Sequence, residues 1–118
     1  MMSALIADDA EIVRVTLRMI LTKNGYGLIY EAKDGKEAVE TYKTHTPDIV
    51  TLDVTMDIVD GIEALKQIMA INPNAKVLMV SAMSQDIIVR DAIKTGAGGF
   101  IVKPFTEQQI TDALNKLR

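Results

Sequence analysis

The sequence predicts a doubly wound α/β domain, built from one parallel sheet with helices on both faces. Short apolar runs that suit strands alternate five times with segments of helical periodicity, which is the pattern of repeated right-handed βαβ units. The run at residues 49–52 is almost continuously apolar, as in a strand that is covered on both faces. With 118 residues, 48% of them hydrophobic, the chain is expected to form one domain over residues 1–118 with a core that needs no disulfide.

The ends of the expected elements follow from turn residues and helix-stop residues. Gly25 is placed to end the first helix, Pro47 closes the second, and Asn72-Pro73 halts the third. No internal repeat or linker interrupts the pattern. We therefore expect strands at residues 3–7, 28–32, 49–52, 76–81 and 100–103, and helices at residues 12–24, 35–45, 62–71, 85–95 and 106–118.

Three helices have recognisable residues for their N-terminal caps. Asp34 is expected to cap the second helix, and Glu37 stands three residues later, as in a capping box. Ser84 is expected to cap the fourth helix. Thr106 and Gln109 repeat the capping-box spacing at the start of the last helix.

Composition excludes several classes of function. The net charge of −3 and a pI near 5.1 give no basic field for nucleic acid, so direct DNA binding is not expected. The sequence has no signal-peptide pattern and no long apolar run, which predicts a cytoplasmic protein without membrane insertion. There are no cysteines, so the fold does not depend on the redox state of its surroundings. We expect a monomer.

Polar side chains stand at the carboxyl ends of four of the expected strands, either as the last residue or directly after it. In a doubly wound sheet of order 2-1-3-4-5, the first and third strands lie side by side at the switch point, where ligands bind beyond the carboxyl ends. That order brings Asp8, Asp9 and Asp53 together, with Ser81 and Lys103 on the next two strand ends. A buried aspartate at a strand end costs solvation free energy unless a cation or hydrogen bonds meet it.

This set of side chains indicates phosphoryl chemistry. Three carboxylates close together repel one another, so such a cluster either takes up protons or binds a hard cation. Mg²⁺ suits a site with few carboxylates and retained waters. Ca²⁺ is disfavoured because no EF-hand loop is present. A lysine and a serine hydroxyl that face the metal are what a phosphoryl group needs, so Asp53 becomes a candidate nucleophile that forms an aspartyl-phosphate.

Together these motifs resemble the receiver domains of two-component signalling, and most closely the single-domain chemotaxis regulators of the CheY type. The resemblance covers essentially the whole chain and rests on pieces that occur in order: Asp8-Asp9, residues 52–56 with Asp60-Gly61, Ser81-Ala82 and residues 100–105. It implies the CheY-like, flavodoxin-like (βα)5 fold. It also implies a switch that catalyses its own phosphorylation and dephosphorylation but turns over no external substrate.

The resemblance also implies roles for the residues at the strand ends. Asp53 would take a phosphoryl group from a phosphohistidine on a sensor histidine kinase. Asp9 and Asp53 would bind Mg²⁺ together with the backbone carbonyl of Thr55, while Asp8 would hold the ion directly or through water. Lys103 would pair with the phosphoryl oxygens.

The same resemblance implies how the signal leaves the domain. Ser81 would move toward the phosphoryl group and open space for Phe100 to rotate inward, which changes the binding preference of the face formed by the fourth helix, fifth strand and fifth helix. A cis peptide bond is expected before Pro104. The downstream protein is expected to be a flagellar or archaellar motor component. The alternatives are a phosphorelay intermediate that serves a histidine phosphotransferase, and a receiver cut from a larger response regulator.

The chain departs from the family pattern at Asp57, where most receivers have proline. The Asp57 side chain is expected either to face solvent, which we favour, or to interact with the Mg²⁺ site and alter its affinity for the metal. Met83 and Thr55 would flank the path of the hydrolytic water without an acidic or amide group to orient it, which predicts a phosphoryl lifetime at least as long as in relatives that carry such a group. His45, the only histidine, is expected at the surface with no catalytic role.

Other classes of protein fit the sequence less well. A phosphatase of the haloacid dehalogenase type needs a second acid two residues after its nucleophile, and here that position is Thr55. A flavin- or nucleotide-binding domain wants a Gly- or hydroxyl-rich phosphate loop after the first strand, where Asp8-Asp9 would repel phosphate. A pseudo-receiver that binds partners without phosphorylation would not need the full set of acids, hydroxyl and lysine.

Overall fold

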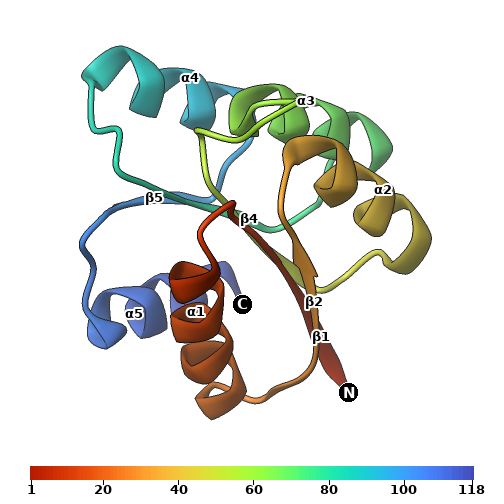
Figure 1. Cartoon of the computed structure of the whole chain (residues 1–118), viewed down its shortest axis with the longest axis vertical. Coiled ribbons are helices and arrows are strands. Elements are labelled where there is room, and N and C mark those ends of the chain that lie inside the picture. The colour runs from red at the N-terminus through yellow and green to blue at the C-terminus, as the bar shows by residue number, and fades with distance from the viewer.

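Strands and helices alternate along the whole chain, and the computed structural model describes all residues from Met1 to Arg118 (Figure 1). Every element predicted from the sequence is present, in the predicted order. The elements are β1 (Met2–Ala7), α1 (Glu11–Lys23), β2 (Tyr26–Ala32), α2 (Gly35–His45), β3 (Ile49–Leu52), α3 (Gly61–Ile71), β4 (Val77–Ser81), α4 (Asp86–Thr95), β5 (Gly99–Val102) and α5 (Glu107–Leu117).

The five strands form one parallel sheet in the order β2-β1-β3-β4-β5, which confirms the predicted topology. In the register of β1 and β3, Ala7 lies opposite Leu52. Both strands therefore end at the same height. The residues that follow them in the chain, Asp8 and Asp53, emerge side by side at the switch point.

The sheet separates two apolar layers, as Figure 1 shows from the placement of the helices. Alternate residues of each strand point to opposite faces, so Leu5 belongs to one layer and Ile6 to the other. Helices α2, α3 and α4 cover the first layer, and α1 and α5 cover the second. Every residue of β3 is buried, which explains the continuous apolar character of that strand in the sequence.

The helix caps differ in part from the prediction. Asp34 caps α2 as expected, since its side chain accepts from the Glu37 amide at 2.8 Å. The Glu37 carboxylate accepts from the amide of Lys33 at 3.4 Å and not from the amide of the cap residue Asp34, so only one half of the expected capping box is formed. The capping box of Thr106 and Gln109 is confirmed in both directions.

The prediction of Ser84 as the cap of α4 is wrong. Gln85 takes the N-cap position and makes no side-chain hydrogen bond there. The carbonyl of Gln85 already accepts from the amides of Ile88 and Val89, so Gln85 is the N-cap residue. Ser84 therefore lies one residue before the capping position.

Several strand boundaries lie one or two residues from their predicted positions, while other expectations hold. β2 begins at Tyr26 rather than at residue 28, because Gly25 turns the chain at φ +94° and the buried Tyr26 pairs at once with Met2. β5 ends at Val102, which leaves Lys103 just beyond the sheet. The peptide bond between Lys103 and Pro104 is cis, as expected. His45 is exposed, with its ring stacked on Tyr30 at a centroid distance of 4.2 Å.

Candidate functional site

Three carboxylates meet at the carboxyl ends of β1 and β3. Asp8 and Asp9 follow β1, Asp53 follows β3, and one carboxylate oxygen of each lies within 4.8 Å of the others. Asp8 and Asp53 are 1% and 5% exposed, whereas Asp9 faces solvent. The sequence-based prediction that these three acids come together is thus met by the geometry. The buried pair needs compensation for lost solvation.

Backbone hydrogen bonds fix the two buried acids. The Asp53 amide donates to the Ala7 carbonyl at 3.0 Å, and the Asp8 amide donates to the Ala32 carbonyl at 3.1 Å, so both residues continue the sheet ladder. One oxygen of each carboxylate accepts from the backbone two residues later: Asp8 from the Ala10 amide at 2.9 Å and Asp53 from the Thr55 amide at 3.3 Å. The other oxygen of each is left for a cation.

Lys103 supplies that cation. Its Nζ donates to Asp8 Oδ2 at 2.7 Å and to Asp53 Oδ2 at 3.2 Å. Its backbone amide donates to the Ser81 carbonyl at 2.8 Å, which anchors the side chain beside the end of β4. A lysine that follows β5 therefore crosses β4 to reach the acids of β1 and β3, as the predicted strand order requires.

The ionisation of this group reflects burial as well as pairing. Burial raises the pKa of the Asp8 carboxyl, and the hydrogen bond from Lys103 offsets that rise only in part. Burial alone would lower the pKa of Lys103, but the hydrogen bond to Asp8 and the charge of Asp53 outweigh it, so that pKa is raised. The ammonium group therefore stays charged at neutral pH while it bridges two carboxylates.

Ser81 is fully buried at the end of β4, and its Oγ accepts from the Met83 amide at 3.1 Å. Phe100 is partly buried and packs against the apolar layer under α2, α3 and α4. Met83, in the turn after β4, packs against the same apolar layer as Phe100.

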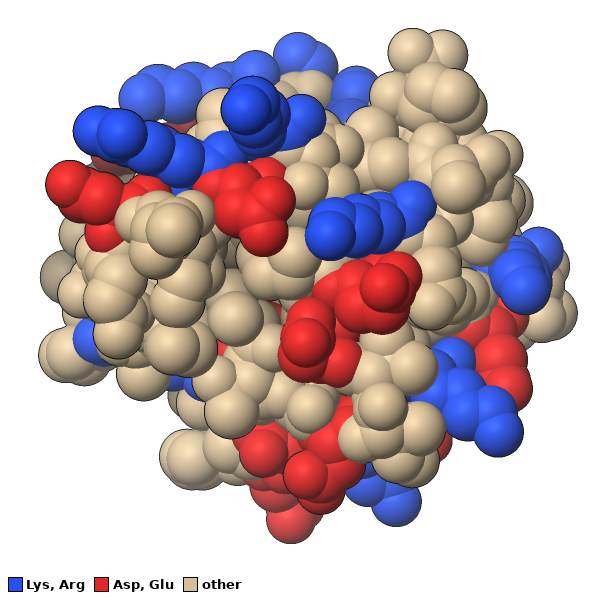
Figure 2. Space-filling view, turned by 90° about the horizontal axis from the view of Figure 1, so that it is seen from above, with Lys and Arg blue, Asp and Glu red and all other residues tan.

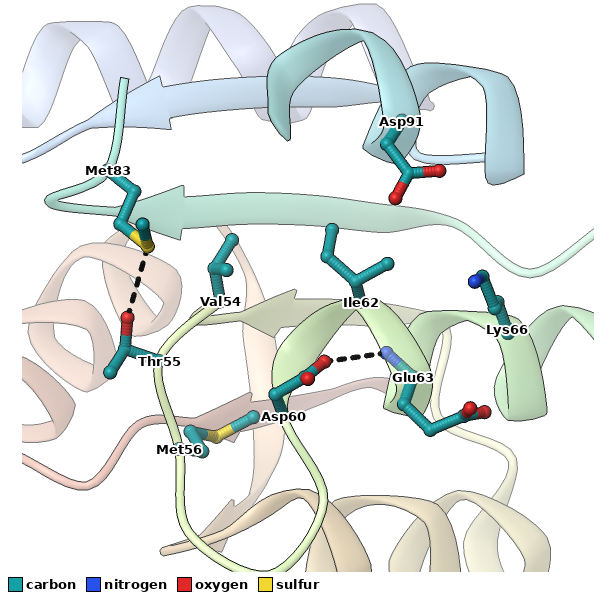
Figure 3. Close-up of a pocket in the computed structure, with 9 residues that line it drawn as sticks. All are labelled: Val54, Thr55, Met56, Asp60, Ile62, Glu63, Lys66, Met83 and Asp91. Carbon is teal, nitrogen blue, oxygen red and sulfur yellow. Dashed lines mark hydrogen bonds between the residues drawn. The ribbon is translucent and has the colours of Figure 1, made fainter. Parts of the chain in front are cut away.

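A cavity of about 490 Å³ opens between the loop after β3, helix α3, the turn after β4 and the middle of α4 (Figure 3). On its edge nearest the strand ends, Thr55 Oγ1 donates to Met83 Sδ at 3.4 Å. Asp60 caps α3 through the Glu63 amide at 2.9 Å, and Asp91 enters from α4 on the opposite side. The two residues predicted to flank the water path are therefore in contact with each other.

The loop after β3 holds a feature that the sequence did not reveal. Ile58 has φ +67°, a conformation that a β-branched residue rarely adopts, and the Val59 amide donates across it to the Asp57 carbonyl at 2.7 Å. Asp57 is exposed and lies outside the group of three clustered acids. Its side chain faces solvent, which was the favoured expectation.

Gly61 is a residue of the site that the sequence analysis treated only as part of a motif. A Cβ at this position would lie 1.8 Å from the Asp53 carbonyl oxygen, and the Gly61 amide donates to the Val54 carbonyl at 2.7 Å. The first turn of α3 therefore packs directly on the backbone of the central acid. An Asp-Gly pair at the start of a helix was the available signal, but the contact itself depends on the fold.

Charge on the surface is mixed. On the face shown in Figure 2, Asp and Glu side chains form groups near the centre and the lower edge, and Lys and Arg side chains lie mostly around them. No continuous basic patch covers this face. None of the five helices has the length and apolarity needed to cross a bilayer.

The fold and the site together define a class of protein: a doubly wound α/β domain with a lysine-bridged acid cluster at its switch point, able to hold a cation next to a buried carboxylate. The chain belongs to the response regulator receiver domain family, whose model matches residues 4–115. Receiver domains generally bind Mg²⁺ at an acidic pocket, and this chain carries the cluster of three aspartates described above.

Similar proteins include chemotaxis regulators. The chemotaxis protein CheY of Thermotoga maritima is 53% identical over 113 residues, which cover 96% of this chain and 94% of that protein. The chemotaxis protein CheY of Bacillus subtilis is 50% identical over 112 residues, covering 95% and 93%. A crystal structure of a CheX–CheY–BeF₃–Mg²⁺ complex from Borrelia burgdorferi contains a chain that is 41% identical, with a TM-score of 0.92 and coverage of 96% and 86%.

Proposed function

We propose that this chain is a phosphorylation-activated switch in which Asp53 accepts a phosphoryl group from a phosphohistidine of a sensor histidine kinase. The observation that carries the proposal is the buried Asp53 carboxylate, with the Lys103 ammonium 3.2 Å from one oxygen and two further acids in the same cluster. An Asp53 oxygen attacks phosphorus, the P–N bond to the imidazole breaks, and its electron pair returns to the ring nitrogen, which takes up a proton.

The acid cluster is proposed to hold Mg²⁺ through Asp8, Asp9 and Asp53, with the backbone carbonyl of Thr55 as a further ligand. The donor set fits this ion, because it consists of carboxylate oxygens and because the exposed Asp9 leaves room for retained waters. When bound, the ion supplies positive charge against the phosphoryl oxygens. The similar CheY from Borrelia burgdorferi, whose complex contains BeF₃ and Mg²⁺, supports this assignment.

Lys103 and Ser81 are proposed to respond to the new phosphoryl group. The Lys103 ammonium, which here bridges Asp8 and Asp53, transfers to a phosphoryl oxygen as the charge on Asp53 moves outward. The Ser81 hydroxyl donates to another phosphoryl oxygen and draws the turn that contains Met83 with it, since the Met83 amide is bound to Ser81 Oγ. Phe100, which packs against the same apolar layer as Met83, then moves inward.

The output is proposed to be docking of another protein on the face formed by α4, β5 and α5. Three large apolar side chains are exposed on the first two of these elements: Ile87, Ile93 and Val102. Because proteins about half identical to this chain are chemotaxis proteins, we assign the switch to chemotaxis, with a flagellar or archaellar motor component as the partner. We also propose that the switch acts in the cytoplasm, where ATP is available to a histidine kinase.

The test is the intact mass of the protein after incubation with acetyl phosphate, with and without Mg²⁺. Wild type is expected to gain one phosphoryl group only when Mg²⁺ is present, and Asp53→Asn is expected to gain none, because the amide is not a nucleophile of this kind. Circular dichroism of both proteins serves as the control for folding. A folded wild type that gains no mass with Mg²⁺ would overturn the proposal in favour of a pseudo-receiver.

A further inference from the structure

Arg14, on the second turn of α1, connects the acidic loop to the edge strand of the sheet. Its Nη1 donates to the backbone carbonyl of Asp8 at 2.8 Å, and its Nε donates to Glu31 Oε1 at 2.9 Å. The arginine side chain is only 12% exposed. A nearly buried guanidinium therefore ties the peptide between Asp8 and Asp9 to a carboxylate on β2.

Glu31 holds this arginine from the outside. Its second oxygen accepts from Arg18 at 2.8 Å, and Arg18 also donates to the Ile29 carbonyl at 3.2 Å. Partial burial would raise the pKa of Glu31, but the hydrogen bonds from Arg18 and Arg14 outweigh it and lower that pKa. The carboxylate thus remains ionised and fixes the direction of the Arg14 fork.

Asp9 is the acid that depends on this arrangement. Its carboxylate makes no hydrogen bond or ion pair within the chain, unlike those of Asp8 and Asp53. Only the backbone sets where the Asp9 side chain points. The carbonyl that Arg14 holds belongs to the peptide plane that leads into Asp9, so the rotation of this plane decides whether the third carboxylate meets the other two.

We propose that Arg14 is a positioning residue that sets the Mg²⁺ affinity of the acid cluster by holding Asp9 through the Asp8 carbonyl, with Glu31 as its anchor. The inference rests on the proposed Mg²⁺ site. The sign of the change in Mg²⁺ affinity on loss of Arg14 separates positioning from a charge effect, because a guanidinium near a cation site would by charge alone weaken cation binding. Positioning predicts that loss of Arg14 weakens Mg²⁺ binding, whereas simple electrostatics predicts that it strengthens binding.

The experiment is calorimetric titration of the full chain with MgCl₂ alone. Arg14→Met keeps the apolar stem and removes the fork, and we expect its Mg²⁺ affinity to fall about tenfold, as for other partners that orient metal ligands. Arg14→Lys retains the charge but cannot reach both acceptors at once, so we expect a smaller loss. An Mg²⁺ affinity of Arg14→Met that is unchanged or higher overturns the inference.

Arg18→Met is the matched control. It removes the other cation from Glu31 and the contact with Ile29, but Arg18 touches no part of the acidic loop. We expect its Mg²⁺ affinity to stay within about twofold of wild type, since surface ion pairs contribute little. An equal loss of affinity in Arg14→Met and Arg18→Met would show that loosening of the sheet edge, not positioning, lowers binding.

A double-mutant cycle with Asp9→Asn separates this inference from the proposed site. If Asp9→Asn does not weaken Mg²⁺ binding, the proposed metal site fails and the inference fails with it. If Asp9→Asn weakens binding, Arg14→Met is expected to cause no further loss in that background. A full additive loss there overturns the positioning role while the metal site stands. Should Arg14→Met not fold, Glu31→Gln takes its place. It is expected to weaken Mg²⁺ binding in the wild-type background but not in Asp9→Asn. If Glu31→Gln does not weaken binding in the wild-type background, the inference is overturned.

Discussion

The two sides of the site are held in place by different means. On the acid side, Asp8 and Asp53 are buried, continue the sheet ladder through their amides and share the Lys103 ammonium. On the flanking side, Thr55 and Met83 lie on loops, and their side chains meet through a 3.4 Å hydrogen bond to sulfur, a weak acceptor. This difference between the two sides indicates that the residues at the sheet ends determine whether Asp53 accepts a phosphoryl group. The loop residues Thr55 and Met83 can change the lifetime of that group without disturbing its acceptance.

The largest effect is expected where the two sides join, at Gly61. A methyl group there would lie 1.8 Å from the Asp53 carbonyl oxygen, so Gly61→Ala must push α3 away from the central acid. We expect the free energy of unfolding in urea to fall by about 3 kcal/mol, at the upper end of overpacking costs. Gly27→Ala is the control, because its added Cβ meets only the flexible Met1 side chain. Equal losses in the two variants would contradict the close packing of α3 on Asp53.

Phosphoryl lifetime should respond to the flanking side alone. Met83→Glu places a carboxylate beside the path of the hydrolytic water, and we expect it to shorten the half-life of the phosphorylated protein about tenfold through water orientation. Met83→Leu, which offers no polar group, should leave the half-life within about twofold, since the two side chains are similar in volume. Phosphate release measures both rates. Faster loss from wild type than from Met83→Glu would contradict the account.

A smaller effect is expected inside β3 itself. Thr51 is buried, and its hydroxyl is the one buried side-chain oxygen or nitrogen without a hydrogen-bond partner. Thr51→Val removes that unsatisfied group at almost constant volume, so the free energy of unfolding should rise by about 1 kcal/mol in urea denaturation. Phosphorylation by acetyl phosphate should not change. A loss of stability would show that a partner for this hydroxyl exists.

The smallest effect concerns the pH dependence of the Glu31 pairs. Because the pKa of Glu31 is lowered in the folded protein, its pairing stabilises the fold above the ordinary value of 4.5 and loses this effect as the pH falls through the lowered value. We therefore expect Glu31→Gln to be less stable than wild type at pH 7. The difference should shrink as the pH falls below 4.5 in thermal unfolding. A difference that grows toward low pH would contradict the pairing.

The sequence predicted the acid side of the site and much less of the flanking side, for a physical reason. Asp8, Asp53 and Lys103 follow apolar runs, and once the strand order is known their positions are determined by parallel register. The side-chain conformations of loops have no such constraint. The positive φ of Ile58 has no signal in the local sequence, since that region of φ favours glycine or asparagine.

Contacts made by side chains on the helices could not be predicted from the sequence either. Arg14 reaches the Asp8 carbonyl because of how α1 is rotated about its axis over the sheet. Apolar periodicity fixes that rotation only to within the width of the apolar stripe, about 100°. Ser84 was chosen as a cap by residue type, but the backbone begins α4 after Gln85. The chemistry at strand ends is thus more predictable than the contacts that support it.

The most direct test of the central claim is to locate the phosphoryl group. Borohydride reduces an acyl phosphate on aspartate to homoserine, which tandem mass spectrometry of peptides can place in the chain. The account predicts homoserine at position 53 in wild type treated with acetyl phosphate and Mg²⁺, and the same result in Asp57→Asn, whose replaced side chain lies outside the acid cluster. Homoserine at position 57, or at position 8 or 9, with residue 53 unmodified would contradict it.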